Sequence, residues 1–429
     1  MEVLRQCLPP SVRRCLDELP ESLDETYERV LREIKKPNRN RARRLLQCLV
    51  VAIRPLRVEE LAEVLAVDFD DARGIPKLNP NWRWEDQQHA LLTACSSLIA
   101  IVNTGPSRVV QFSHFSVKEF LTSQRLATSN LDVSLYHIVL EPAHRLLAEA
   151  CLSIFLDNLI EDSSFEEHSP LAEYAAEHWV RHAQFEDVAS RVKGIEYLFD
   201  LDKPYFSAWC QFHDIDSNHD SIFYFSIPGS KSGINTPLYY AALCGFKSLV
   251  ERLIVKHPDH VNAIGGYHLT PAVAALAGRH FELAQVLHRN GSSVDPPGER
   301  GKSLLHCAAY KEDLEMIQVL LDYGLNVNTP DKLGSTPLNF ALEYRSTVID
   351  PRVVRLLLDH GADPNVLGWQ GKTQLHRASQ SGRIEIIRLL VEHGASVEVR
   401  DDEGRTPMDV ASGEQREEII KLLLEHRAT

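Results

Sequence analysis

The sequence lacks the features that mark exported and membrane-spanning proteins. No apolar run approaches the ~18 residues that a membrane span needs. The first ten residues show no basic stretch followed by an apolar one, so we expect no secretory signal. The eight cysteines are scattered, with no Cys-x-x-Cys pair, which is typical of reduced thiols. We therefore expect a cytoplasmic protein.

The common catalytic and nucleotide-binding motifs are also missing. Two Gly-Lys-Ser/Thr triplets begin at Gly301 and Gly371, but a phosphate-binding loop needs a glycine five residues earlier, where Pro296 and Val366 stand. No Gly-x-Ser-x-Gly elbow occurs. We predict no enzyme, no cofactor and no small-molecule substrate.

One pair of histidines has a spacing that can bind zinc. His178 and His182 lie four residues apart, on one face of an expected helix. The zinc protease motif needs a glutamate directly after the first histidine, and Trp179 occupies that position. We expect two partly exposed histidines and no metal. The turn sequence His257-Pro258-Asp259-His260 is likewise interpreted as a turn.

Charge is distributed unevenly. The net charge is −14, and residues 131–230 hold 5 Lys/Arg against 18 Asp/Glu, whereas residues 1–130 hold 19 against 17. A nucleic-acid-binding protein normally shows a basic face. The one short basic run, from Lys35 to Arg44, is interpreted as a solvated loop that leads into a helix. We expect neither nucleic acid nor a membrane as a partner.

A repeat of about 33 residues fills the C-terminal part of the chain. Its Thr/Ser positions are 236, 270, 303, 336, 373 and 406, with one longer step that places an insertion near 345–350. Thr336 can cap a helix that starts at Pro337, and Gly361 can end the second helix with a positive φ. The period and the Thr-Pro-Leu-His-x-Ala motif identify residues 231–429 as a stack of six ankyrin repeats.

Ankyrin stacks bind protein partners on a concave face made of inner helices and hairpin tips. Interface energy is concentrated in aromatic residues and arginine. These rules predict a partner-binding patch, with Phe340 and Tyr344 equally able to pack on the insertion. The candidate residues are Tyr240, Tyr310, Lys311, Phe340, Tyr344, Trp369 and Arg377.

The N-terminal part alternates helix signals with one hairpin signal. Residues 19–31 predict a helix with a Ser22/Glu25 capping box near its start, and residues 45–53 and 55–67 predict two more helices. Residues 97–102 and 108–112 flank a turn and predict a hairpin, followed by a helix from Ser116. Helices before a hairpin favour a winged helix. The expected fold is mainly α, with a winged-helix-like α+β module, an α-helical connector and an ankyrin solenoid.

Three N-terminal segments, 19–31, 54–67 and 112–121, resemble those after the nucleotide-binding core of fungal NACHT–ankyrin proteins. These are signal-transducing ATPases related to NOD-like receptors. Residues 170–185 and 203–214 resemble their helical connector. The resemblance implies a helical segment at 1–35, a winged helix at 36–130, an acidic connector at 131–230 and ankyrin repeats at 231–429. Their phosphate-binding loop would lie before Met1.

One histidine of the winged helix is a special case of this resemblance. His114 matches the family's histidine that touches a bound nucleotide diphosphate. Without a nucleotide core we expect it to make local hydrogen bonds at a strand-to-helix turn.

Three functions remain open from the sequence. The first is a non-enzymatic interaction or scaffold protein in NOD-like receptor-type signalling. The second is a C-terminal fragment of a NACHT ATPase whose phosphate loop lies outside this chain. The third is a DNA-binding winged-helix regulator, which is disfavoured because the expected recognition helix near Glu59–Glu63 is acidic and would repel phosphate.

Overall fold

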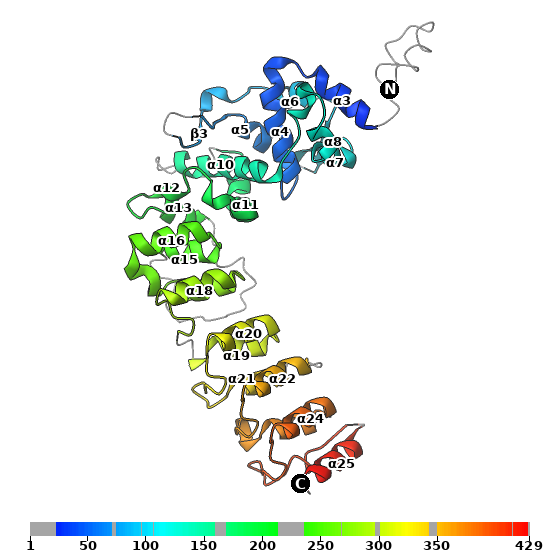
Figure 1. The fold of residues 1–429 in the computed structure, drawn as a ribbon, viewed down its shortest axis with the longest axis vertical. Coiled ribbons are helices and arrows are strands. Elements are labelled where there is room, and N and C mark those ends of the chain that lie inside the picture. The colour runs from blue at the N-terminus through cyan, green and yellow to red at the C-terminus, as the bar shows by residue number, and fades with distance from the viewer. Residues whose placement is uncertain are drawn as a thin grey trace. The chain divides into compact units, whose positions relative to one another are not determined.

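The computed structural model divides the chain into two compact units, Met1–His213 and Asp214–Thr429 (Figure 1). Most of the described chain is helical, and its named strands all lie in the first unit. Within the described part, no helix combines the length and the apolar character needed to cross a bilayer. The described residues are 23–70, 74–95, 97–105, 107–158, 169–212, 236–266, 268–296, 301–342, 350–413 and 415–427.

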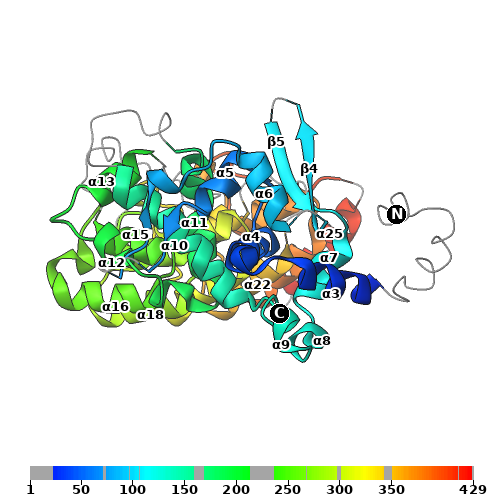
Figure 2. The same cartoon turned by 90° about the horizontal axis from the view of Figure 1, so that it is seen from above.

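The first unit contains a winged helix. Strand β5 lies between β1 and β4, all antiparallel, with Val110 opposite both Leu56 and Ile101. The predicted hairpin is confirmed, and Figure 2 shows its two strands side by side. The elements are α3 (Leu23–Glu33), α4 (Arg39–Val51), β1 (Leu56–Arg57), α5 (Val58–Val64), α6 (Gln87–Cys95), β4 (Ile99–Thr104), β5 (Ser107–Phe112), α7 (Phe115–Leu121), α8 (Gln124–Ala127) and α9 (Leu131–Ser134).

The helix expected at 55–67 is shorter in the structure. Strand β1 precedes α5, and β2 (Val67–Asp68) follows it and pairs with β3 (Lys77–Leu78). The second helix of a helix-turn-helix is the one that enters a DNA groove. Residues 59–63 lie in α5, which α6 follows along the chain, and the assignment of recognition to residues 59–63 stays a prediction. Glu60 and Glu63 in α5 are 0% and 1% exposed, which means that they could not repel phosphate at a surface.

The acidic middle segment packs on the winged helix within the first unit. Helix α10 lies beside α4, and Ile53 N–H donates to Tyr174 Oη at 3.2 Å. Trp179, Phe199 and Trp209 pack together in its core with ring centroids 5.2–6.5 Å apart, and Trp209 meets the other two rings edge to face. The helices are α10 (Leu140–Asn158), α11 (Ala172–Gln184), α12 (Ile195–Leu198) and α13 (Tyr205–Phe212).

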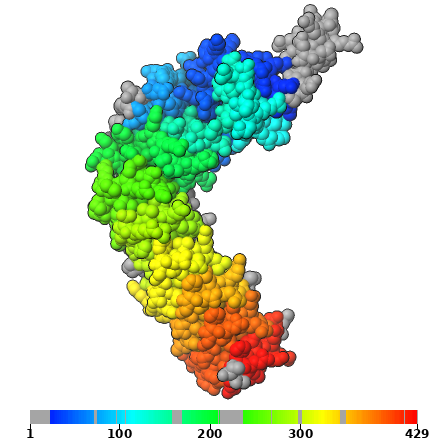
Figure 3. Space-filling view, in the orientation of Figure 1, coloured from blue at the N-terminus to red at the C-terminus, as the bar shows by residue number. Residues whose placement is uncertain are grey.

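The second unit is a stack of helix pairs, confirming the expected solenoid. Inner helices pack on inner helices and outer on outer, and Figure 3 shows neighbouring repeats in continuous contact from yellow to red. The pairs are α15 (Pro237–Leu243) with α16 (Lys247–Lys256), α17 (Pro271–Ala277) with α18 (Phe281–Arg289), α19 (Leu304–Tyr310) with α20 (Leu314–Asp322), α21 (Pro337–Ala341) with α22 (Pro351–Asp359), and α23 (Gln374–Gln380) with α24 (Ile384–Glu392).

The sixth repeat departs from this pattern. Its inner segment, from Thr406, makes hydrogen-bonded turns but no helix, and Gly413 follows with φ 92°. The outer helix α25 (Arg416–Arg427) still packs against α24. The expected insertion at 345–350 lies almost wholly outside the described residues, between α21 and α22.

Candidate partner-binding surface

A buried histidine fixes the start of two inner helices. His376 is 0% exposed, and its Nδ1 accepts from Thr373 N–H at 3.2 Å and lies 2.8 Å from Thr373 Oγ1. Since Nδ1 accepts, the ring proton lies on Nε2, which donates to the Arg405 carbonyl of the next repeat at 3.0 Å. His306 repeats this arrangement, with its Nε2 2.9 Å from the Ser335 carbonyl. Burial lowers the pKa of both histidines, which favours the neutral ring.

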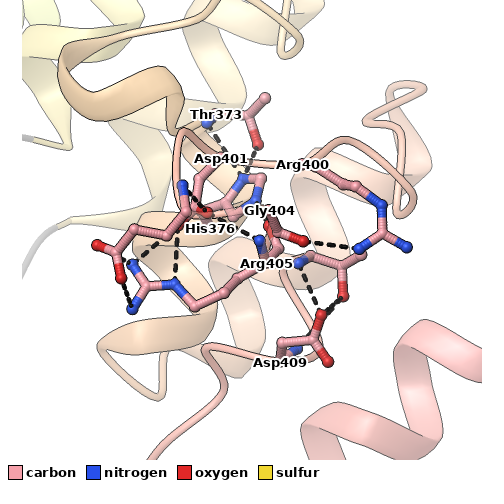
Figure 4. A network of polar contacts seen from close by, with 9 residues as sticks. Thr373, His376, Arg400, Asp401, Gly404, Arg405 and Asp409 are labelled. Atoms are coloured by element: carbon pink, nitrogen blue, oxygen red, sulfur yellow. Dashed lines mark hydrogen bonds and ion pairs between the residues drawn. The ribbon is translucent and has the colours of Figure 1, made fainter.

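A carboxylate rigidifies the hairpin tip that precedes each of two inner segments. Asp401 accepts from the Glu403 and Arg405 N–H groups at 3.0 and 2.9 Å and from the Arg405 guanidinium at 2.9 Å (Figure 4). Asp331 likewise accepts from two N–H groups of its own turn, at 2.9 and 2.8 Å. Both carboxylates are therefore used inside their own turns. The other side chains of each tip point outward from a backbone that these hydrogen bonds hold in place.

Large apolar side chains stand exposed on these tips. Trp369 in η9 (Trp369–Gly371) is 75% exposed, and the next tip holds its loop because Asp402 N–H donates to the Gln370 carbonyl at 3.1 Å. Leu333 is 79% exposed and Leu367 is 57% exposed. The prediction of an exposed Trp369 at a tip agrees with these values. The sequence reading missed both leucines, although an apolar residue in a polar turn is a visible signal.

The predicted residues on the inner helices differ in exposure. Tyr310, at the end of α19, is 36% exposed, and Lys311 follows it in the open. Phe340 is half-buried, with Lys302 Nζ 4.7 Å and the His306 ring 5.0 Å from its ring centroid. Arg377 is half-buried at the repeat position equivalent to Phe340. Phe340 therefore packs on repeat three, and its contact with the insertion stays a prediction.

Two of the predicted partner-contact residues cannot be placed on the exposed surface of the repeats. Tyr240 is 2% exposed and meets the Tyr239 ring edge to face at 5.3 Å. All seven residues of α15 are buried, so this first inner helix presents no face to a partner, and the prediction for Tyr240 was wrong. Tyr344 lies outside the described residues.

Basic side chains accompany the apolar ones over repeats three to five. Lys311 and Lys332 are exposed, and Lys302, Lys372 and Arg377 are half-buried. Asp331 and Asp401 are used inside their turns, whereas Asp402 is exposed on the tip that follows Trp369. We call the following set the inner face: Lys302, Tyr310, Lys311, Lys332, Leu333, Phe340, Leu367, Trp369, Lys372 and Arg377.

The histidines of the first unit have structural partners. His114 caps α7, with Nδ1 accepting from Ser116 N–H at 3.3 Å, which confirms its local role. His182 is 0% exposed and lies 2.8 Å from Tyr174 Oη and 2.9 Å from His144 Nδ1. The expectation of a partly exposed His182 was wrong, because α11 buries this side against α10. Burial lowers the pKa of His182 to about 3 and that of His144 to about 4.

One group of side chains in the described chain has the chemistry of a metal site. His257, Asp259 and His260, at the turn η7 (Pro258–Asn262), bring their ligand atoms within 4.8 Å of one another at the surface. Their ring stacking, at 5.0 Å between centroids, is also that of a compact turn. The expectation that this segment forms a turn is confirmed.

Comparisons with known families agree with both units. Residues 27–133 match the winged helix domain of GPI inositol-deacylase, and residues 271–367 and 350–429 match the ankyrin repeats family in its three-copy form. The first match ends at the start of the acidic segment, and the second covers α17 to α25.

Similar curated proteins come from several organisms. A Monascus ruber protein named azaphilone pigments biosynthesis cluster protein L is 29% identical over 65% of this chain and 61% of its own length. Human Rabankyrin-5 is 31% identical over 31% of this chain and 11% of its own, and the Neurospora crassa ankyrin repeat protein nuc-2 is 26% identical over 34% and 14%. The chain thus spans less than two thirds of each of these relatives. It combines a winged helix domain of the GPI inositol-deacylase type with C-terminal ankyrin repeats.

Proposed function

We propose that this protein is a non-enzymatic scaffold that binds a protein partner on the inner face of repeats three to five, the concave side expected for an ankyrin stack. The observation that carries the proposal is Trp369, an indole 75% exposed on a tip that hydrogen bonds hold in place. Exposed apolar patches on a soluble protein mark interaction sites. Tryptophan and tyrosine are also the residues in which binding energy concentrates.

The rigidity of the tips favours tight binding. Ordering a mobile loop on association costs free energy, and a loop that is already fixed avoids that cost. The turn of Asp331 fixes Leu333, and the Gln370–Asp402 hydrogen bond fixes the loop of Trp369. Truncating a central interface tryptophan costs about 2 kcal/mol or more, which is about a 30-fold loss of affinity.

The charge of the inner face indicates the chemistry of its partner. Its polar members are four lysines and one arginine, and the exposed Asp402 lies beside them at Gly371. Complementary charge raises the association rate and selects partners. We therefore infer a partner segment that carries acidic residues beside an apolar side chain. Its affinity falls as salt rises, since surface charges are screened within about 8 Å at physiological ionic strength.

The absence of catalysis in this proposal rests on the state of the thiols and histidines. Burial raises the pKa of Cys48 and Cys95 to about 12 and that of Cys307 to about 11, so these thiols stay protonated near neutral pH. Protonated thiols are poor nucleophiles. The described histidines at helix starts are committed to capping bonds, as His306 and His376 show.

A capture experiment with a matched control tests the binding proposal. The full chain serves as bait beside the Tyr310→Ala/Trp369→Ala variant and the Val255→Ala variant. Val255 is 83% exposed on the outer helix α16, so its truncation removes exposed apolar surface elsewhere. We expect a partner that the wild type and Val255→Ala capture and that the double variant loses. A partner captured equally by all three contradicts the proposal.

The setting that we propose is NOD-like receptor-type signalling in the cytoplasm, with the ankyrin repeats as sensor. The resemblance of the winged-helix and connector segments to NACHT–ankyrin proteins supports it. If the first unit relays partner binding, the captured partner should change amide hydrogen exchange along α4 and α10 in the full chain. Exchange that changes in the ankyrin repeats alone would contradict the relay and leave the binding proposal intact.

A further inference from the structure

A polar cleft in the first unit is not explained by partner binding. Helices α4 and α10 lie side by side, and between them opens a cleft of about 430 Å³. One wall is the α4 face with Arg43 and Gln47, and the other is the α10 face with Arg145 and Glu149. Phe69 and the exposed carboxylate residue Asp70 also line it. A cleft of this size matches the lower range of small-molecule sites.

Three arginines line this cleft, and none forms an ion pair with another described residue. Arg43 is exposed, whereas Arg44 and Arg145 are half-buried. The Arg44 guanidinium lies over the Phe69 ring, with Cζ 4.8 Å from the ring centroid. Several other arginines of the unit are paired; Arg57, for example, contacts Glu60 and Glu173 at 2.9 and 2.8 Å. Guanidinium groups bind phosphate through two parallel hydrogen bonds.

Two further polar side chains line the cleft. Gln47 is 6% exposed and lines the cleft. Glu149, 7% exposed, accepts from Lys193 N–H at 3.2 Å through Oε1 and also lines the cleft.

We propose that this cleft binds a small organic phosphate that carries hydroxyl groups. Arg43, Arg44 and Arg145 hold the phosphate, and the Gln47 amide and the Glu149 carboxylate bind hydroxyls. The two kinds of group lie on both helices, so one ligand bridges α4 of the winged helix and α10 of the connector. A ligand that binds the folded state also stabilises it in proportion to its concentration. The cleft is independent of the inner face, and the two proposals can fail separately.

Calorimetry and thermal unfolding with the full chain test this site. The probes are ribose 5-phosphate and pyrophosphate, with ribose and citrate as the neutral and the non-phosphate anionic controls. We expect ribose 5-phosphate to bind one per chain and to raise Tm, with citrate and ribose weaker by about tenfold or more. Citrate binding as tightly as the phosphates, or no phosphate binding at about millimolar concentration, would overturn the proposal.

Variants separate a built site from general attraction to a basic surface. Arg43→Gln/Arg145→Gln should weaken both phosphates by about tenfold or more. Arg181→Gln, which removes an exposed cation of α11 in the same unit, should leave binding unchanged. Gln47→Leu should weaken ribose 5-phosphate more than pyrophosphate, because it removes a hydroxyl partner. Should the double variant fail to fold, exposed Arg43→Gln alone replaces it. Equal losses in Arg181→Gln and the arginine variants would contradict the site.

Discussion

Replacing His376 by alanine tests how the repeats are held together. The ring does two jobs, capping α23 at Thr373 and donating to the Arg405 carbonyl of the next repeat. Losing a helix N-cap arrangement costs about 1 kcal/mol, and losing a hydrogen bond between protein groups costs about 1 kcal/mol more. The buried cavity and the orphaned polar groups add to this. The variant should therefore lose about 2–4 kcal/mol of unfolding free energy.

Another repeat of the chain suggests a variant that separates the helix cap from the hydrogen bond between repeats. In repeat four Asn339 caps Thr336 N–H at 2.9 Å, but its Nδ2 has no hydrogen-bond partner among the described residues, the next repeat included. His376→Asn should thus keep the cap and lose the cross-repeat bond, with about half the destabilisation of His376→Ala. The matched control is His360→Ala, an exposed histidine bonded within its own helix at 2.9 Å, which should cost under about 0.5 kcal/mol.

The pH dependence of the unfolding free energy gives a second test of the same contact. Burial lowers the pKa of His376 below its ordinary value of 6.5, so the folded state favours the neutral ring. Its contribution to stability is fully present above pH 6.5 and is lost as pH falls from 6.5 through the lowered pKa. Urea unfolding of the full chain, followed across this range, should show a smaller acid loss in His376→Ala. Equal destabilisation by the alanine variants of His360 and His376, or an unchanged pH slope, would refute this reasoning.

Two further predictions concern the first unit. Glu60→Ala should destabilise it by about 3–5 kcal/mol in urea unfolding, because two arginines lose a carboxylate that is 0% exposed. The control Glu59→Ala, whose side chain is 38% exposed, should cost little. Similar losses for both variants would contradict the buried pair. Burial lowers the pKa of His144 to about 4 and of His182 to about 3, so the stability of the unit should fall as pH drops from 6.5 toward 4. His182→Gln should make this loss smaller. An unaltered pH profile of Tm in that variant would contradict the prediction.

The repeats could be predicted because each motif residue acts locally. Thr336 caps its own helix, Pro337 starts it, and Gly361 adopts φ 84° after the next one. None of these depends on distant parts of the chain. The hairpin was found for the same reason, since its turn and alternating strands are contiguous.

The missed elements depend on distant contacts. Strand β1 has two residues and exists because it pairs with Val110, over 50 positions away in the sequence. The apolar residues of α6 do not gather on one face, so its sequence gives no clear helical period. At the site, the position of Trp369 on a tip followed from the repeat. The burial of Tyr240 did not, because burial depends on how α15 packs against other helices such as α17.

The most direct test of the account is the affinity of the captured partner for single inner-face variants of the full chain. Calorimetry at low and high salt would compare wild type, Trp369→Ala, Lys332→Ala and the outer-face control Val255→Ala. We predict a loss of about 2 kcal/mol for Trp369→Ala, a smaller loss for Lys332→Ala that vanishes at high salt, and none for the control. Equal affinity for Trp369→Ala and wild type would contradict the claim that this face holds the partner.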